Sequence, residues 1–396
     1  MKTTDIMKRL AGLGGEKWKV HFKAREMIKG GADVIELTIG EPDVPTPDTL
    51  VDAAVASLQE GRTGYSDGQG EIGLRDALAG YYTRTRGRAF AADQIMCFPG
   101  TQTALYAALQ GVAEAGDEVL VGDPLYATYE GVIRASGATP IFVPLHPEHG
   151  FRLQAEDLAK CITPRTRALL LNSPHNPTGA VLTQAEIAAI GDLALAHDFW
   201  IISDEVYEDL VFDDVPFVSP LSLPQIADRV VAVSSISKSH AAPGFRSGWA
   251  VGPLAFMEAL LPLAETMLFG NQPFIADMTA VGIREGSLVA AGMRERFQAR
   301  AAKLADVLHG QTALRVHMPE AGMFALIDVS ATGMGAEEYA FDLLERAGVA
   351  VMPGTSFGAQ LKNWVRVALT VDDADFATTC DRIAAHSATL NAPVAQ

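Results

Sequence analysis

The chain reads RVVAVSSISK from Arg229 to Lys238. The apolar first part of this stretch predicts a buried β-strand, and Lys238 lies just beyond its end. A second apolar run, residues 199–203, leads into Asp204, and Arg246 follows eight residues after Lys238. Charged groups at the ends of buried strands are costly unless something binds them. Pyridoxal phosphate (PLP) uses a lysine for its Schiff base, an acid for its ring nitrogen and positive charge for its phosphate. These residues therefore predict a PLP site.

Short β-rich runs alternate with helical patterns through the middle of the chain. The expected strands are residues 94–98, 118–121, 139–143, 168–171, 200–203, 230–234 and 248–251. Amphipathic stretches such as 102–115 and 184–197 separate them. This alternation predicts an α/β fold with a mainly parallel seven-stranded sheet between helices. Ligands of such sheets bind beyond the carboxyl ends of the strands, where Asp204, Lys238 and the turn at Gly100 are expected.

The pattern changes near residue 288. A long helical stretch, 288–309, precedes strand-like runs at 323–329, 350–352 and 364–370, and a last helix is expected from residue 372 to about 388. We therefore expect a smaller α+β domain over residues 288–396 and a large cofactor-binding domain over residues 47–287. The N-terminal segment, residues 1–46, is expected to pack with the small domain. Residues 391–396 are expected to be frayed.

Composition excludes several classes of protein. The 396 residues are 48% hydrophobic, which is ample for a large core. No apolar run approaches the ~20 residues of a membrane span, and the N-terminus lacks an apolar signal core, so a cytoplasmic enzyme is expected. The three cysteines are far apart and form no metal motif, which favours a reducing compartment. The net charge of −17 disfavours nucleic acid and anionic membranes as partners.

The segment from Ser235 to Gly248, SISKSHAAPGFRSG, resembles the PLP-attachment signature of the class I and II aminotransferases. It departs from that signature at Ser247, where the family prefers an aliphatic residue. Further motifs with the family's spacing extend from Gly40 to Arg366. The resemblance implies the fold of the type I PLP-dependent transferases, transaminase activity, and a homodimer whose active sites are shared between chains.

The resemblance also implies roles around the cofactor ring. Lys238 forms the Schiff base and, once freed, acts as the base that removes the substrate α-proton. Asp204 holds the ring nitrogen, although an aspartate here could also cap a turn. Tyr207 and Asn176 contact the ring's phenolic oxygen, and Tyr126 stacks on the ring. For either tyrosine, ordinary core packing is the alternative.

A glycine-led turn joins an expected strand to an expected helix at Pro99-Gly100-Thr101-Gln102. Free N–H groups at a helix N-terminus suit phosphate, although such turns are common without a ligand. The residues that the resemblance assigns to the phosphate are Gly100, Thr101, Gln102, Ser235, Ser237 and Arg246, together with Tyr65 from the partner chain.

Four residues are expected to contact the substrate. The resemblance assigns the backbone of Gly40 to the pocket, and it assigns Asn176 and Arg366 to the α-carboxylate. Arg366 lies in an apolar run, where an arginine is costly unless paired, so a structural salt bridge is the alternative. Trp18 is expected near the substrate side chain, although an ordinary N-terminal helix would explain it equally well.

The sequence narrows the substrate only partly. Within the family, several stretches are most similar to transaminases that use arginine with pyruvate, and others resemble the bacterial aspartate aminotransferase branch. Aspartate-selective relatives carry a lysine where Gln102 stands, which favours a non-acidic amino donor; Glu16 could then face a cationic side chain. An aspartate-type aminotransferase, a PLP-dependent lyase of the same fold and, more remotely, a PLP-sensing regulator are the alternatives.

The resemblance implies cis peptide bonds beside the cofactor. The matching bonds here are Asp123–Pro124 and Asn176–Pro177. The cis form costs only ~0.5–1 kcal/mol before proline, so tertiary contacts can select it.

Overall fold

A seven-stranded sheet forms the centre of the computed structural model, which describes residues 2–390 apart from the side chain of Glu16. Its strands are β2 Ile95–Phe98, β3 Glu118–Asp123, β4 Thr139–Pro144, β5 Thr166–Asn172, β6 Trp200–Asp204, β7 Val230–Ser235 and β8 Gly248–Val251. The spatial order is β2-β8-β7-β6-β5-β3-β4, and β8 runs in the direction opposite to the other six strands. The predicted α/β fold with a mainly parallel seven-stranded sheet is confirmed.

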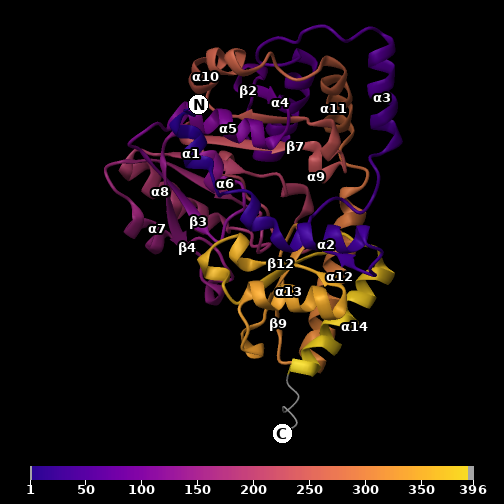
Figure 1. Ribbon diagram of the computed structural model, residues 1–396. Helices are drawn as coiled ribbons and strands as arrows, with labels where there is room; N and C mark the ends of the chain where they lie inside the picture. Colours follow the sequence, from indigo (N-terminus) through magenta and orange to yellow (C-terminus); the bar gives the residue numbers. More distant parts are fainter. Residues whose placement is uncertain (1, 391–396) are drawn as a thin grey trace.

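Helices cover both faces of this sheet (Figure 1). One face packs against α5 Thr101–Val112, α6 Tyr129–Ser136 and α10 Leu254–Met267. The other face packs against α3 Asp48–Gln59, α4 Ile72–Arg86, α7 Ala155–Cys161, α8 Gln184–His197 and α11 Pro273–Glu285. Strand side chains alternate between the two cores: Val231 and Val233 join the first core, whereas Val230 and Ala232 join the second.

The C-terminal part forms a second sheet, with the order β12-β13-β10-β9. Its strands are β9 Arg315–His317, β10 Phe324–Asp328, β12 Met352–Pro353 and β13 Trp364–Ala368. Helices α12 Ala290–Gln311, α13 Ala336–Ala347 and α14 Asp373–Leu390 share its core. Figure 1 shows these elements in orange and yellow, with the N-terminal α2 Lys19–Lys29 beside them. A separate two-stranded parallel sheet pairs β1 Ile35–Glu36 with β11 Val349–Ala350. Helix α1 Asp5–Leu10 packs against α6 of the large sheet's helical cover.

Local chemistry explains where the expected helix bounds held and where they did not. The Thr183 hydroxyl oxygen accepts a hydrogen bond from the Glu186 amide, and the Glu186 carboxylate accepts one from the Thr183 amide, so α8 begins at the expected residue. Helix α5 ends at Val112, three residues earlier than expected. The Asp117 carboxylate accepts from the Glu114 amide at 3.0 Å, which holds that N–H outside the helix.

The run expected as one strand at 350–352 is two strands. Its first part, β11, pairs with β1, and β12 after Val351 pairs with β13, so the chain passes from one sheet to the other at that residue. Strand β9 was not expected. The division into domains at residues 46 and 287 stays a prediction, and the expected fraying of residues 391–396 lies outside the described residues.

The two expected cis peptide bonds, Asp123–Pro124 and Asn176–Pro177, are confirmed, and Ser173–Pro174 is a third. In the described part of the chain, every helix is too short or too polar to cross a membrane.

Candidate active site

A cavity of about 330 Å³ opens at the carboxyl ends of the central strands. It collects most of the predicted site residues from distant parts of the chain. The predicted residues that line it are Trp18, Gly40, Thr101, Gln102, Tyr126, Asn176, Asp204, Tyr207, Ser235, Ser237, Lys238, Arg246 and Arg366. Of the remaining two, Gly100 immediately precedes the lining residue Thr101, and Tyr65 is exposed on the surface.

Lys238 lies on the one-turn helix α9 Ile236–Ser239, which follows β7 directly. Its Nζ donates a hydrogen bond to the carbonyl oxygen of Gly40 at 2.9 Å. Burial lowers the pKa of Lys238 to about 8, against the opposing charge of Glu41. The amine is therefore neutral in a substantial fraction of molecules near pH 8, as a nucleophile or base requires.

Asp204 is the last residue of β6 and is buried. The Tyr129 hydroxyl donates to Asp204 Oδ2 at 2.8 Å and the Val206 amide donates to Oδ1 at 3.2 Å. Burial raises the pKa of Asp204 to about 6, and these two hydrogen bonds oppose the rise. Because the described residues offer this carboxylate no cationic partner, a positively charged ring nitrogen in the cavity would fit it.

Arg366 is buried on β13, between the rings of Phe324 and Phe357. Its Nη1 donates to Asn176 Oδ1 at 3.0 Å and its Nη2 donates to the Thr38 carbonyl oxygen at 2.7 Å. Burial lowers its pKa to about 10. Nε is buried without a hydrogen-bond partner among the described residues. An incoming carboxylate would satisfy both this atom and the charge, whereas the alternative of a structural salt bridge has no acidic partner in the described part of the chain.

The phosphate side of the cavity is formed by the N-terminus of α5. Gly100 precedes this helix with φ +89°, and a Cβ there would lie 2.3 Å from Nη2 of Arg246, so the close approach requires glycine. Thr101 Oγ1 is buried and has no partner among the described residues. Uncapped helix N–H groups, an unsatisfied hydroxyl and a guanidinium together fit a phosphate.

Tyr207, Asn176 and Tyr126 lie on the walls between these groups. Asn176 Nδ2 lies 3.5 Å from the Tyr207 hydroxyl, at the limit of a hydrogen bond. The Tyr126 ring meets the Tyr129 ring edge-on, with centroids 5.5 Å apart. Ser235 Oγ accepts from the Ser237 amide at 3.3 Å, which folds the chain into α9. Tyr126 and Lys238 both line the cavity.

Ser247, the departure from the family signature, is buried behind the site. Its hydroxyl pairs with Thr279 Oγ1 at 2.7 Å and with Asn271 Nδ2 at 3.3 Å. A polar side chain is tolerated there because both partners are supplied from the region of α11.

Tyr129 is a site residue that the sequence did not single out. It begins α6, and its hydroxyl reaches Asp204 across 75 positions of sequence.

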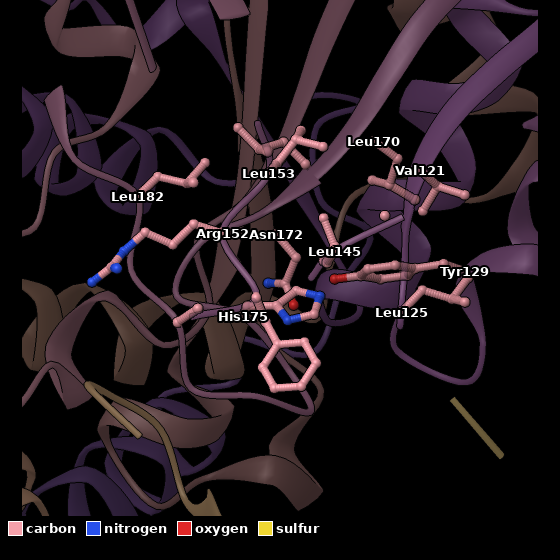
Figure 2. A pocket seen from close by; sticks show the side chains of 14 residues that line it. Val121, Leu125, Tyr129, Leu145, Arg152, Leu153, Leu170, Asn172, His175 and Leu182 are labelled. Atoms are coloured by element: carbon pink, nitrogen blue, oxygen red, sulfur yellow. The ribbon is translucent and has the colours of Figure 1, made fainter. Parts of the chain in front are cut away.

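Tyr129 also lines a second cavity of only about 30 Å³. Figure 2 shows Tyr129, Asn172 and His175 close together in it and the Arg152 guanidinium turned away. Burial lowers the pKa of His175 to about 4, so this imidazole is neutral. Such a volume suits one or two water molecules and is too small for a substrate.

The comparisons with known proteins agree with this geometry. A family model for aminotransferase class I and II matches residues 32–383. The arginine–pyruvate transaminase AruH of Pseudomonas aeruginosa is 42% identical over 390 residues, which cover 98% of this chain and 99% of that protein. The aspartate/prephenate aminotransferase of Cereibacter sphaeroides is 35% identical, with 93% of this chain and 95% of that protein covered.

Solved structures give the same result. A double mutant of Thermus thermophilus aspartate aminotransferase superimposes with a TM-score of 0.92 at 30% identity, covering 98% of this chain and 100% of that chain. The aromatic aminotransferase of Pyrococcus horikoshii OT3 gives a TM-score of 0.86 at 29% identity, covering 91% and 98%. The fold that the sequence motifs implied is therefore confirmed over nearly the whole chain.

Proposed function

The chain belongs to the class I and II aminotransferases and is a transaminase, and from this premise we propose that it uses PLP to move the α-amino group of a non-acidic L-amino acid to a 2-oxo acid. When bound, PLP supplies an electron-withdrawing ring that stabilises negative charge at the substrate α-carbon. The protein's own residues hold that ring, orient the substrate and move the proton.

The proposed roles follow from the groups that surround the cavity. Lys238 holds the cofactor covalently and, as a neutral amine, carries the proton to and from the substrate α-carbon. Asp204 keeps the ring nitrogen protonated, and Tyr129 fixes the orientation of its carboxylate. Asn176 and Tyr207 contact the ring oxygen, and Tyr126 covers one face of the ring.

The two ends of the site bind anions. Arg366, whose Nε has no partner in the described part of the chain, takes the substrate α-carboxylate, and the Gly40 backbone lines the same cavity. The residues proposed to hold the phosphate are Gly100, Thr101, Gln102, Ser235, Ser237 and Arg246. One observation carries the proposal: within a single cavity, the Lys238 amine, the Asp204 carboxylate and the Arg366 guanidinium all lack an oppositely charged hydrogen-bond partner among the described residues.

Arginine with pyruvate as acceptor is the substrate pair that we propose. Gln102 lines the cavity and its side-chain oxygen accepts a hydrogen bond from Thr128 at 3.0 Å, so this position offers a second carboxylate an amide and not a cation. Trp18 lines the cavity as well, and its indole ring could stack against a guanidinium. The similarity to the arginine–pyruvate transaminase of Pseudomonas aeruginosa supports the same pair.

A panel of amino donors assayed against pyruvate and 2-oxoglutarate tests this proposal. We expect kcat/KM for arginine with pyruvate to exceed that for aspartate by at least about tenfold, since one charged contact is worth about 1.4 kcal/mol or more. A preference for aspartate would overturn the substrate proposal while leaving the transaminase standing. Consumption of the amino donor without any dependence on a 2-oxo acid would instead indicate a lyase.

We further propose a homodimer in which Tyr65 contacts the phosphate of the partner's cofactor. The Tyr65 side chain is 94% exposed in the isolated chain and meets the ring of Phe269, itself 55% exposed, with centroids 6.1 Å apart. Two exposed aromatic rings side by side suit a surface that a second subunit covers. The cytoplasmic location expected from the sequence stays a prediction.

Tyr65→Phe is expected to weaken PLP binding about tenfold, because one hydrogen bond to a charged phosphate is lost, and to leave the dimer intact. Sedimentation gives the assembly state and fluorescence titration gives the PLP affinity. Tyr106→Phe, which removes a phenol from a separate surface pocket, is the matched control and should change neither. A fully active monomer would refute the shared site; an unchanged PLP affinity in Tyr65→Phe would remove only this residue from it.

A further inference from the structure

The guanidinium of Arg366 is oriented by two oxygen atoms of the protein. One is the side-chain oxygen of Asn176 and the other is the backbone carbonyl oxygen of Thr38, at 2.7 Å. The rings of Phe324 and Phe357 confine the plane of the guanidinium but allow it to rotate within that plane. The Thr38 carbonyl and the Asn176 oxygen therefore together fix where Nε–H points, and a shift of the Thr38 carbonyl would turn it.

The regular backbone pairing ends one residue before Thr38. Strand β1 ends at Glu36, and Leu37 still exchanges backbone hydrogen bonds, donating to the Ala350 carbonyl at 2.8 Å and accepting from the Ala368 amide at 3.1 Å. Thr38 is fully buried, and its hydroxyl donates to Glu36 Oε1 at 3.0 Å. Beyond the end of the sheet pairing, the hydrogen bond between the Thr38 and Glu36 side chains thus holds the Thr38 peptide unit in place.

His21 on α2 closes this contact into a triangle. Its Nδ1 lies 2.7 Å from Glu36 Oε1 and 2.9 Å from Thr38 Oγ1. Since the threonine hydroxyl already donates to the glutamate, its oxygen can only accept from the histidine, which places the proton on Nδ1. The His21 and Glu36 side chains are each 18% exposed, so these hydrogen bonds are largely shielded from water.

We propose that His21 is a positioning residue for the substrate carboxylate: acting through Glu36 and Thr38, it sets the orientation of Arg366. This inference rests on the proposed role of Arg366 in the transaminase. The His21 ring also meets the indole of Trp18 edge-on, with centroids 6.1 Å apart, and Trp18 lines the cavity. The same helix therefore supports the carboxylate clamp and the wall beside the substrate side chain.

His21→Leu and His21→Asn form the test pair. Leucine has a side chain of similar bulk to histidine but cannot donate a hydrogen bond. Asparagine, by contrast, can supply an N–H from its Nδ2 near the position of the histidine Nδ1. We expect His21→Leu to raise the KM of both the amino donor and the 2-oxo acid about tenfold with kcat within about twofold, and we expect His21→Asn to recover most of this loss. Propionate, a carboxylate without an amino group, should show the same change in dissociation constant by ligand-observed NMR.

Two further variants separate positioning from general stability. Arg25 contacts the other oxygen of the same carboxylate, Glu36 Oε2, at 3.3 Å from an exposed position, so Arg25→Ala should leave propionate affinity unchanged. Thr38→Val removes only the hydroxyl and should reproduce the His21→Leu result, which keeps the proposal testable if His21→Leu does not fold.

The propionate titration distinguishes the two proposals. Unchanged propionate affinity in folded His21→Leu or Thr38→Val would overturn the positioning role, as would an equal loss in Arg25→Ala. A wild-type protein that binds propionate but transfers no amino group from any donor would contradict the proposed function instead, and the variants would still decide the role of His21.

Discussion

Lys238→Ala is expected to abolish the visible absorption band of the purified protein and to lower turnover by at least about 10⁴-fold. A single group would be lost that both holds the cofactor covalently and moves the substrate proton, and each of these roles is large by itself. Absorbance spectra and single-turnover rates with the preferred amino donor measure the two losses separately. Alanine leaves the neighbouring Gly40 carbonyl without its 2.9 Å partner and removes the aliphatic stem of one side chain, a loss felt in packing and not in the chemistry of the amine.

A matched lysine variant and chemical rescue control this result. Lys160→Ala removes an exposed lysine whose contact is an ion pair with Asp157, and it should keep the band and full turnover. A small primary amine added to Lys238→Ala should restore part of the lost rate if the missing function is that of a base. A variant that kept both the band and the wild-type rate would show that another residue holds the cofactor.

The pH dependence of the cofactor-free protein follows from the same lysine. Its pKa is lowered from 10.5 to about 8 by burial, so the folded state releases a proton that the unfolded state retains between these values. The contribution of Lys238 to the free energy of unfolding is therefore less favourable at pH 7 than at pH 10. Lys238→Ala should remove this difference in thermal unfolding experiments.

The sequence predicted the large sheet well because its signals are local. Short apolar, β-branched runs such as 230–234 favour buried strands, and parallel strands bring their carboxyl ends to one edge of a sheet, so Asp204 and Lys238 are expected to lie together. The start of α8 was predictable for a similar reason, since Thr183 and Glu186 carry the capping signal within four residues.

What the sequence could not predict depends on contacts between distant segments. The Tyr129 hydroxyl reaches Asp204 from another helix, and a tyrosine in a loop-to-helix turn carries no sign of such a partner. The triangle of His21, Glu36 and Thr38 joins α2 to a strand end only once both pack against the second sheet. Gly100 and Arg246 were both expected near the phosphate. Only the structure shows that a side chain at position 100 would collide with the Arg246 guanidinium.

Asp204→Asn is expected to keep PLP binding within about tenfold while turnover falls by about 10²–10³-fold. Asparagine preserves the volume and can still accept the hydrogen bond from Tyr129, which is 2.8 Å in the native protein. It cannot supply the negative charge that keeps the ring nitrogen protonated, and preorganised charges of this kind commonly contribute such factors. Single-turnover rates with the preferred amino donor measure the effect apart from product release.

The buried charge gives this prediction a second readout. Because burial raises the pKa of Asp204 from 3.8 to about 6, the folded cofactor-free protein holds a proton between these values that the unfolded chain has released. The cofactor-free protein therefore loses stability as the pH rises from about 4 to 6, and the deficit persists above pH 6.

A cationic ring nitrogen offsets this deficit, so PLP should raise the melting temperature more at pH 7.5 than at pH 5. Asp204→Asn should remove the part of that pH dependence that Asp204 contributes, whereas Tyr129→Phe, which leaves the charge in place, should retain it. An equal PLP-induced shift at both pH values in the native protein would mean that Asp204 does not face the ring nitrogen.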